Sequence, residues 1–163
     1  MEHYNKNKLW IFVTMLVVSI YTNAQQSMRE LIAEEMQFAA KQYKILAKNT
    51  PNDSMPRSYV AQKNKSINSD TKWWCSGFFP GSLWLIYEYT KDESIRKEAE
   101  KRLSILEKEK HYTQNHDLGF MMFCSFGNAY RITGNKIYKP TIDTAAGSLI
   151  TRYRPAIQSI QSW

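Results

Sequence analysis

The sequence predicts an all-α protein built from helical hairpins, with an inner layer of helices covered by an outer layer. Turn-forming residues are scarce, with 6 glycines and 5 prolines among 163 residues, which disfavours a many-stranded sandwich and favours long helices. Almost wholly apolar segments alternate with amphipathic ones. Two motifs also recur at a nearly fixed spacing. The length suits one domain.

Residues 1–24 have the layout of a secretory signal peptide. Lys6 and Lys8 supply a basic start, an apolar run from Leu9 to Tyr21 follows, and small side chains stand near Ala24. A single-pass membrane anchor remains an alternative, although the run is shorter than the roughly 20 residues that such a helix needs. We expect the mature chain to begin at Gln25 and to act in the periplasm or outside the cell.

The first predicted helix begins at a capping box, in which Ser27 is followed three residues later by Glu30. Apolar residues then recur at helical spacing until Pro51 ends the helix. Residues 49–73 are polar and show no periodicity. They predict a long loop, which is usually functional or a linker.

Two pairs of helices follow. An apolar helix is expected from about Pro80 to Lys91, and Asp92 caps an amphipathic helix after it. The apolar positions of this second helix are Ile95, Ala99, Leu103 and Leu106. The second pair comprises an apolar helix over 118–133 and a more polar helix over about 137–153.

The two pairs also match in sequence. Residues 76–79 (SGFF) resemble residues 118–121 (LGFM), and residues 87–92 resemble residues 130–135, at separations of 42 and 43. Such a period is typical of stacked helical hairpins. The apolar helices would form the inner layer of a solenoid or a closed ring, although chance similarity within a four-helix bundle remains an alternative.

Segments that lead into inner helices meet at one mouth of such a ring. Residues 73–81, 115–120 and 160–163 are three of these segments. Together they carry Trp74, His116, Asp117 and Trp163. Aromatic rings stack on the C–H faces of sugars, and carboxylate and imidazole groups do acid–base work, so these residues predict a carbohydrate site.

Each of these residues also has a plainer interpretation. Asp117 could cap its helix, His116 could be a hydrogen-bonded structural histidine, and Trp73 and Trp74 could belong to the core. Met121, Met122 and the neighbouring phenylalanines are interpreted as packing residues.

Other classes of function lack the residues they require. His111 and His116 are the only histidines after the signal segment, so no metal site is predicted, and Cys75 and Cys124 cannot form a disulfide-rich scaffold, although they could pair. No phosphate-binding or dinucleotide-binding glycine loop and no nucleophile elbow is present. The net charge is +7, but the basic residues are dispersed along the chain and mixed with acidic ones. This pattern favours an anionic sugar over nucleic acid as the ligand.

Three segments resemble one family of enzymes. Residues 74–84 (WCSGFFPGSLW), 116–121 (HDLGFM) and 160–163 (IQSW) are similar to the unsaturated glucuronyl hydrolases of glycoside hydrolase family 88. The resemblance covers roughly residues 28–163. It implies an (α/α)6 barrel of the six-hairpin glycosidase type, no cofactor, and a chain in which residues 25–163 form the N-terminal part of the catalytic domain.

The resemblance also implies a reaction. The family acts on oligosaccharides released by polysaccharide lyases, such as glycosaminoglycan fragments, and hydrates the C4=C5 double bond of the uronic acid at the non-reducing end. Asp117 matches the first of two catalytic aspartates, and His116 matches a residue that contacts the sugar. Trp74 and Trp163 match aromatic residues that stack on the substrate. Whether Asp117 transfers the proton or stabilises charge stays open.

The sequence departs from the pattern of the family at one point, which concerns the catalytic residues. The second catalytic aspartate of the family lies downstream of the position matched by Trp163. We therefore expect the 163-residue chain to be an incomplete barrel with exposed inner-helix surface and no measurable hydrolase activity. A non-catalytic helical sugar-binding module and a hydrolase of unsaturated rhamnogalacturonan fragments remain alternatives. The sequence predicts neither the glycan nor the oligomer.

Overall fold

The computed structural model describes residue 15 and residues 27–162, which fall into two compact units, residues 1–35 and 36–163. The predicted signal peptide, apart from residue 15, and Trp163 lie outside the described residues. The helices are α2 (Met28–Asn49), α3 (Phe78–Thr90), α4 (Glu93–Leu106), α5 (Leu118–Met122), α6 (Asn128–Thr133) and α7 (Lys139–Ile150). The longer helical turns are η2 (Glu107–His111), η3 (Phe123–Gly127) and η4 (Lys136–Tyr138).

Helix α2 begins at the predicted capping box, which belongs to the first unit. The backbone N–H of Glu30 donates to Ser27 Oγ at 3.2 Å, and the N–H of Ser27 donates to Glu30 Oε2 at 3.0 Å. The two bonds satisfy donors that the first turn of a helix otherwise leaves without partners.

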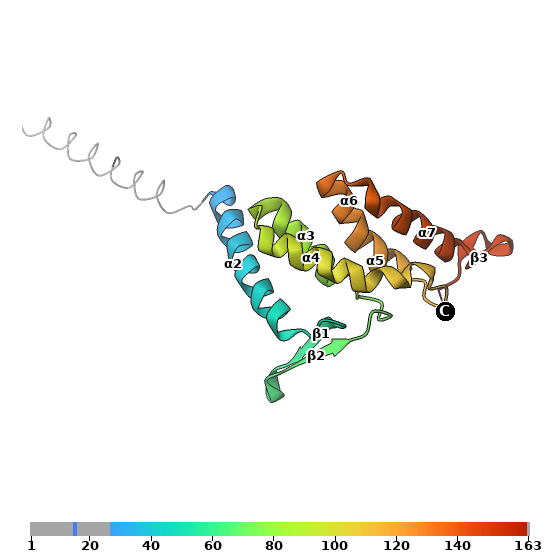
Figure 1. Cartoon of the computed structure of the whole chain (residues 1–163), viewed down its shortest axis with the longest axis horizontal. Helices are drawn as coiled ribbons and strands as arrows, with labels where there is room; N and C mark the ends of the chain where they lie inside the picture. The colour runs from blue at the N-terminus through green and yellow to red at the C-terminus, as the bar shows by residue number, and fades with distance from the viewer. Residues whose placement is uncertain (1–14, 16–26, 163) are drawn as a thin grey trace, which may run out of the picture. The chain divides into compact units, whose positions relative to one another are not determined.

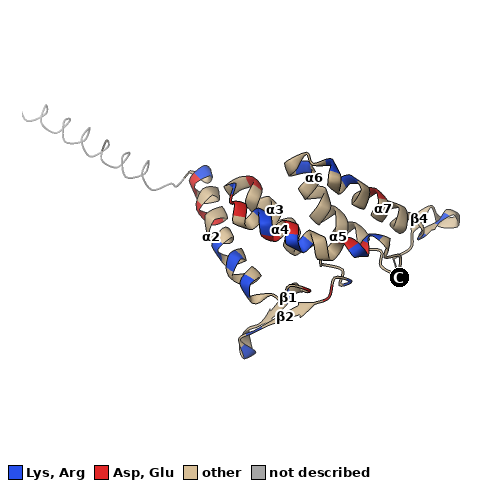
Figure 2. Ribbon diagram, in the orientation of Figure 1, with Lys and Arg blue, Asp and Glu red and all other residues tan. Residues whose placement is uncertain are grey.

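The second unit contains the two predicted helical pairs (Figure 1). Helix α3 packs against α4, and the continuous segment α5–η3–α6 packs against α3 and α7. All four predicted apolar positions of α4 are buried, whereas acidic and basic side chains alternate along its visible side (Figure 2). The alternation of an apolar helix with an amphipathic one is therefore confirmed for this pair.

The two apolar helices run parallel, and residues related by the sequence repeat lie side by side. A Cβ atom on Gly77 would stand 2.1 Å from the carbonyl oxygen of Met121, and one on Gly81 would stand 2.5 Å from that of Cys124. At the other end, Arg131 donates to both carboxylate oxygens of Glu88 at 2.7 and 2.8 Å. The absence of side chains at both glycines lets the two backbones touch.

The second inner helix contains a π-helical segment, η3. Side chains bind carbonyl groups in and just before this segment: Ser125 Oγ donates to Met121 O at 2.6 Å, and Asn128 Nδ2 donates to Cys124 O at 2.8 Å. Segments of this kind interrupt α-helices frequently at functional sites. The predicted apolar helix over 118–133 is therefore confirmed in its extent, with a π-helical segment that the sequence analysis did not predict.

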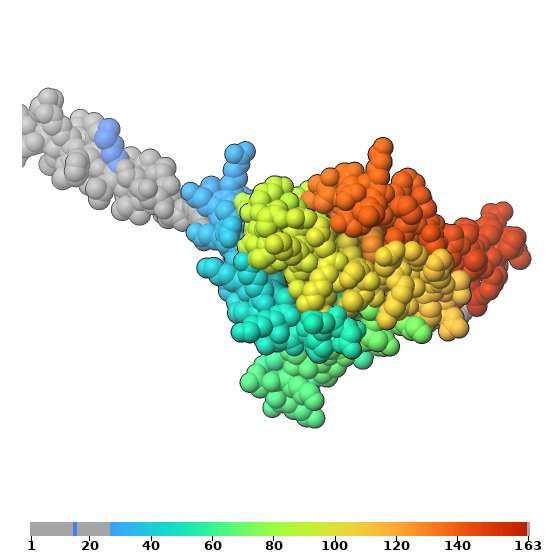
Figure 3. All heavy atoms as spheres, viewed as in Figure 1, coloured from blue at the N-terminus to red at the C-terminus, as the bar shows by residue number. Residues whose placement is uncertain are grey.

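The prediction of a loop over residues 49–73 is wrong in part. An antiparallel hairpin joins β1 (Met55–Val60) to β2 (Lys65–Ser69) through the turn η1 (Ala61–Lys63) and Asn64, which has a positive φ of 45°. The hairpin projects at the lower edge of the view in Figure 3. Both strands are mostly polar and exposed, apart from the buried Met55, so they lack the alternation of apolar residues that identifies a strand.

A second, shorter hairpin shortens the last predicted helix. Helix α7 ends at Ile150 rather than near residue 153, because β3 (Tyr153–Arg154) pairs with β4 (Ser159–Ile160) through the turn η5 (Pro155–Ile157). Gln158 takes the same left-handed conformation, with a φ of 50°, as Asn64 does in the first hairpin. Each hairpin follows an amphipathic helix.

The buried side chain of Arg102 fastens α4 to the end of α2. Its guanidinium donates to the carbonyl oxygens of Pro51, Ser54 and Thr50 at 2.6, 2.8 and 3.2 Å. Glu98 accepts its Nε at 2.7 Å. These bonds satisfy carbonyl groups that the C-terminus of a helix leaves open, and they hold the start of the β1 strand against α4.

The inner helices are not enclosed on every side. Five large apolar side chains on α3 and on the α5–η3 segment are exposed: Phe78, Leu85, Tyr89, Phe120 and Phe123. The exposure agrees with the expectation of apolar surface on the inner layer.

Candidate functional site

The segments that precede the two inner helices lie at the same end of the helix pair. Trp74 stands three residues before Gly77, and Asp117 stands three residues before Phe120. A Cβ atom on Gly77 would lie 2.5 Å from the carbonyl oxygen of Phe120. Because the two helices are parallel and touch at their first turns, the two segments open onto one region, the mouth, defined here by Trp74, Phe78, Phe120, His116 and Asp117.

Three exposed aromatic side chains line the mouth in a row. The ring centroids of Trp74 and Phe78 are 5.6 Å apart and those of Phe78 and Phe120 are 6.0 Å apart, both with edge-to-face geometry. The three residues are 43%, 39% and 51% exposed. The row therefore presents apolar faces to solvent beside the segment that carries Asp117.

The interpretation of the phenylalanines as packing residues is correct only for some of them. Phe79 and Phe126 are buried, whereas Phe78, Phe120 and Phe123 are exposed. The sequence signal that could have separated them is helical phase, because Phe79 lies on the face of α3 that carries the buried Leu83 and Ile86, whereas Phe78 shares the face of the exposed Leu85.

Asp117 does not cap its helix with its side chain. It occupies the position before α5, but its carboxylate accepts no backbone bond there. Instead, Asn115 Oδ1 accepts the N–H of Asp117 at 2.8 Å. The alternative that Asp117 is only a helix cap is therefore wrong, and its carboxylate, 16% exposed, is available at the mouth.

His116 lies beside this carboxylate. Its Nε2 stands 3.3 Å from Asp117 Oδ1, and its side chain is 24% exposed. When the imidazole is protonated, the two groups form an ion pair. An imidazole and a carboxylate in contact can share or transfer a proton, which is the chemistry that acid–base catalysis needs.

A buried hydrogen bond and a cation–π contact fix the loop that carries Trp73 and Trp74. Thr71 Oγ1 donates to Glu109 Oε1 at 2.5 Å, and both side chains are buried. The guanidinium carbon of Arg57 stands 3.8 Å from the centre of the Trp73 ring. Neither tryptophan is fully buried: Trp73 is half-buried and Trp74 is exposed.

Within residues 27–162 no group of three or more His, Cys, Asp or Glu side chains could hold a metal ion. Cys75 and Cys124 are free thiols in the structure, and burial raises the pKa of each. None of the described helices is both long enough and apolar enough to cross a membrane. Trp163, the fourth predicted site residue, lies outside the described residues.

No protein-family model matches the chain. Among curated proteins, an unsaturated glucuronyl hydrolase of Formosa agariphila is 38% identical over 112 residues, which are 68% of this chain and 28% of that protein. An unsaturated chondroitin disaccharide hydrolase of Streptococcus agalactiae is 39% identical over 98 residues, or 58% of this chain and 24% of that protein.

The fold is shared as well. The crystal structure of an unsaturated glucuronyl hydrolase specific for heparin superposes with a TM-score of 0.75 and 34% identity, over 80% of this chain and 35% of that one. Such hydrolases are (α/α)6 barrels, so the predicted all-α fold of helical hairpins is confirmed. The chain spans about a quarter to a third of the length of these relatives. In sequence and in fold, it is similar to the unsaturated glucuronyl hydrolases.

Proposed function

We propose that the chain is part of an unsaturated uronyl hydrolase, a glycoside hydrolase that removes the unsaturated uronic acid from the non-reducing end of lyase-released oligosaccharides. The observation that carries this proposal is the carboxylate of Asp117, which does not cap its helix and lies beside His116 and an exposed aromatic row, in a chain similar to such hydrolases over 80% of its length. One similar structure contains the disaccharide dGlcA-GalNAc6S, which favours glycosaminoglycan fragments as substrates.

The proposed reaction hydrates an enol ether. A proton is added to C4 of the uronic acid and water adds its oxygen at C5, losing a proton to a base. The resulting hemiketal opens and releases the neighbouring sugar. Asp117 either transfers the proton or stabilises the positive charge that develops at C5. His116, whose Nε2 lies 3.3 Å from Asp117 Oδ1, contacts the sugar. Trp74 stacks on the substrate, and Trp163 is assigned the same role from sequence alone.

The proposal includes the setting. Residues 1–24 would export the protein, and residues 25–163 would form part of its catalytic domain in the periplasm or outside the cell. The partner is an anionic unsaturated oligosaccharide rather than nucleic acid or a membrane. Without residues 1–24 the chain keeps 20 basic and 14 acidic residues, and this net charge of +6 is suited to such a ligand.

The test separates binding from chemistry. Titration of the chain with an unsaturated chondroitin disaccharide in a calorimeter should show binding that Trp74→Ala weakens about tenfold, because one stacking face is lost. Asp117→Asn keeps the shape of the mouth and should change the affinity less than threefold. Hydration of the double bond lowers its ultraviolet absorbance, so the rate of this decrease measures the reaction. In the protein that contains this sequence and turns the substrate over, Asp117→Asn should abolish nearly all of that rate.

Tyr153→Ala, at the exposed start of β3, serves as a matched aromatic control and should leave the affinity unchanged. If the Trp74→Ala chain is folded and binds the disaccharide as tightly as the parent chain does, the proposal is contradicted. Retention of more than a tenth of the rate by Asp117→Asn would remove Asp117 from the reaction.

A further inference from the structure

A buried carboxylate outside the mouth contacts the loop that carries Trp74. Glu109 lies in η2, between α4 and the segment that leads to Asp117, and it is only 4% exposed. Its Oε1 accepts the hydroxyl of the buried Thr71 at 2.5 Å. Among the residues that the structure describes, Glu109 forms no ion pair. An apolar side chain would fill the same space at a lower desolvation cost, so the bond to Thr71 is what the carboxylate supplies there.

The loop around Trp74 is stiffened by hydrogen bonds between its own residues. Asp70 Oδ1 accepts the backbone N–H of Lys72 at 3.0 Å, and the carbonyl oxygen of Trp73 accepts the N–H of Ser76 at 2.8 Å. Bonds between such close neighbours fix the shape of a loop, but they do not fix its place in the molecule. That place depends on contacts with other elements.

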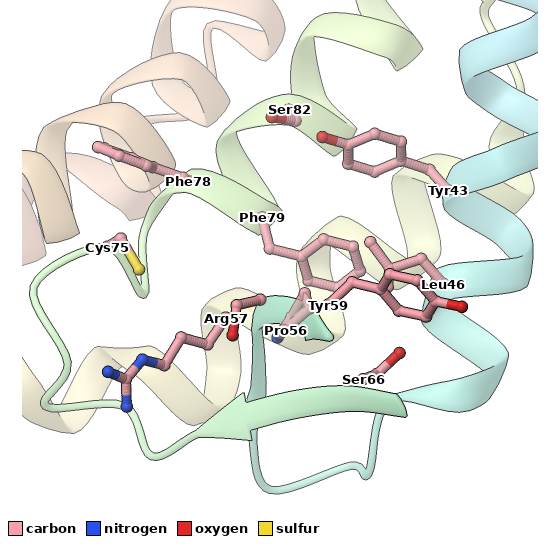
Figure 4. Close-up of a pocket in the computed structure, with 11 residues that line it drawn as sticks. Tyr43, Leu46, Pro56, Arg57, Tyr59, Ser66, Cys75, Phe78, Phe79 and Ser82 are labelled. Carbon is pink, nitrogen blue, oxygen red and sulfur yellow. The ribbon is translucent and has the colours of Figure 1, made fainter. Parts of the chain in front are cut away.

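One of these contacts comes from the exposed hairpin. A cavity of about 380 Å³ lies between α2, the β1–β2 hairpin and the start of α3, and Cys75 of the loop borders it (Figure 4). Figure 4 shows Arg57 extending from the hairpin toward this loop, and its guanidinium carbon stands 3.8 Å from the centre of the Trp73 ring. Arg57 is itself exposed, whereas the contact from Glu109 is buried.

The turn that carries Glu109 also leads into the segment of Asp117. The carbonyl oxygen of Glu109 accepts the N–H of Tyr112 at 2.9 Å. Lys72, in the loop, has its Nζ 5.8 Å from the centre of the Tyr112 ring. Glu109 is therefore bonded through its backbone to the segment before Asp117 and through its carboxylate to the loop before Trp74.

We propose that Glu109 is a positioning residue, which acts through Thr71 to set the place of Trp74 relative to Asp117. The inference rests on the proposed function and adds to it a residue that does not touch the substrate. Loss of the acceptor oxygen of Glu109 weakens the contact of Trp74 with the sugar, while the Asp117 carboxylate keeps its own contact with His116.

The test varies the acceptor oxygen. Glu109→Gln keeps an oxygen that accepts the hydroxyl of Thr71, and it should leave the affinity of the chain for an unsaturated chondroitin disaccharide within twofold. Glu109→Met keeps the length of the side chain without that acceptor, and it should weaken the affinity about tenfold, as Trp74→Ala does. Glu107→Met removes an exposed carboxylate from the same turn and should change nothing.

Two readouts distinguish positioning from a loss of stability. In the Trp74→Ala chain, Glu109→Met should lower the affinity less than twofold further, because both changes remove the same contact with the sugar. In the protein that contains this sequence and turns the substrate over, Glu109→Met should raise KM about tenfold and keep kcat within threefold. A partly unfolded variant would instead lose kcat at an unchanged KM, which would overturn the proposal.

Thr71→Val combined with Glu109→Met removes both polar partners, so no buried group is left without a bond. This double variant replaces Glu109→Met if the single variant does not fold, and it should bind about tenfold more weakly than the parent chain. Parent-like affinity of the variants without the acceptor, or equal losses for Glu109→Gln and Glu109→Met, would overturn the proposal even when Trp74→Ala weakens binding.

The indole signal of Trp74 in NMR spectra of the chain without ligand tests the inference independently of the proposed function. The signal should shift in Glu109→Met and return to its parent position in Glu109→Gln. An indole signal that is the same in all variants would overturn the positioning role. A disaccharide affinity that does not depend on Trp74, together with the expected indole shifts, would instead overturn the proposed function and leave the positioning of Trp74 by Glu109 standing.

Discussion

Asp92 and Asp117 occupy equivalent positions, one residue before a helix, but their carboxylates bind different partners. Asp92 Oδ1 accepts the backbone N–H of Ser94 at 2.9 Å, and its other oxygen accepts Lys44 Nζ at 2.6 Å. Before α5, by contrast, Asn115 Oδ1 accepts the backbone N–H of Asp117 itself at 2.8 Å. The Asp92 carboxylate therefore caps its helix, whereas the Asp117 carboxylate does not cap α5 and its Oδ1 stands 3.3 Å from His116 Nε2.

The difference makes Asp92 a test of stability rather than of function. The hydrogen bond from Lys44, together with those from Ser94, lowers the pKa of Asp92 from 3.8 to about 2. Because the folded-state pKa lies below the unfolded value, the carboxylate stabilises the fold above a pH of about 4, and this stabilisation is lost as the pH falls toward 2. Asp92→Asn keeps a capping oxygen but removes the charge that Lys44 binds, so it should cost about 1 kcal/mol at neutral pH, and the cost should shrink between pH 4 and pH 2.

Urea unfolding at several pH values measures this effect. Asp143→Asn is the control, because Asp143 pairs with Lys139 on the exposed side of α7 and exposed pairs contribute little. A difference between Asp92→Asn and the parent chain that stays constant from pH 7 to pH 2 would contradict the assignment.

Two glycines of α3 determine how closely the two inner helices approach each other. Glycines at positions 77 and 81 allow the backbone of α3 to touch that of the second inner helix, where Cβ atoms would stand 2.1 and 2.5 Å from carbonyl oxygens. Gly81→Ala should therefore lower the free energy of unfolding by about 3 kcal/mol, since the opposing atom is backbone and the helices must separate.

Gly147→Ala provides the control in α7. Apart from the neighbouring backbone of α7 itself, no atom lies within 4 Å of a Cβ atom there, so the substitution should stabilise the chain by up to about 1 kcal/mol through helix propensity. Unfolding midpoints in urea compare the two variants. Equal stability of Gly81→Ala and Gly147→Ala would show that the two inner helices do not meet as described.

The helices could be predicted from the sequence because their signals are local. The capping box at Ser27, the cap at Asp92 and the apolar spacing of α4 each depend on residues within two turns. The β1–β2 hairpin could not, because its strands are polar on both faces and it is anchored by Met55 and by contacts of Arg102 from a distant helix. Its absence from the prediction also concealed the cavity that the hairpin closes.

The candidate site was predictable to the extent that it depends on the repeat. A period of about 43 residues places equivalent positions side by side, as in the pairing of Glu88 with Arg131, and so it brings the segments around Trp74 and Asp117 to one end. Periodicity does not report which aromatic side chains remain exposed, so Phe78 and Phe120 were missed. Nor does it report the partners of Arg57, because stacking on Trp73 depends on how the hairpin folds back.

The proposed function requires the segments before the two inner helices to form a single sugar-binding mouth. Titration of the ¹⁵N-labelled chain with an unsaturated disaccharide, followed by NMR, tests it most directly. We predict that the indole signal of Trp74 and the amide signals of residues 116–120 shift together and report the same dissociation constant. Shifts confined to one of these segments, or two different dissociation constants, would contradict the claim.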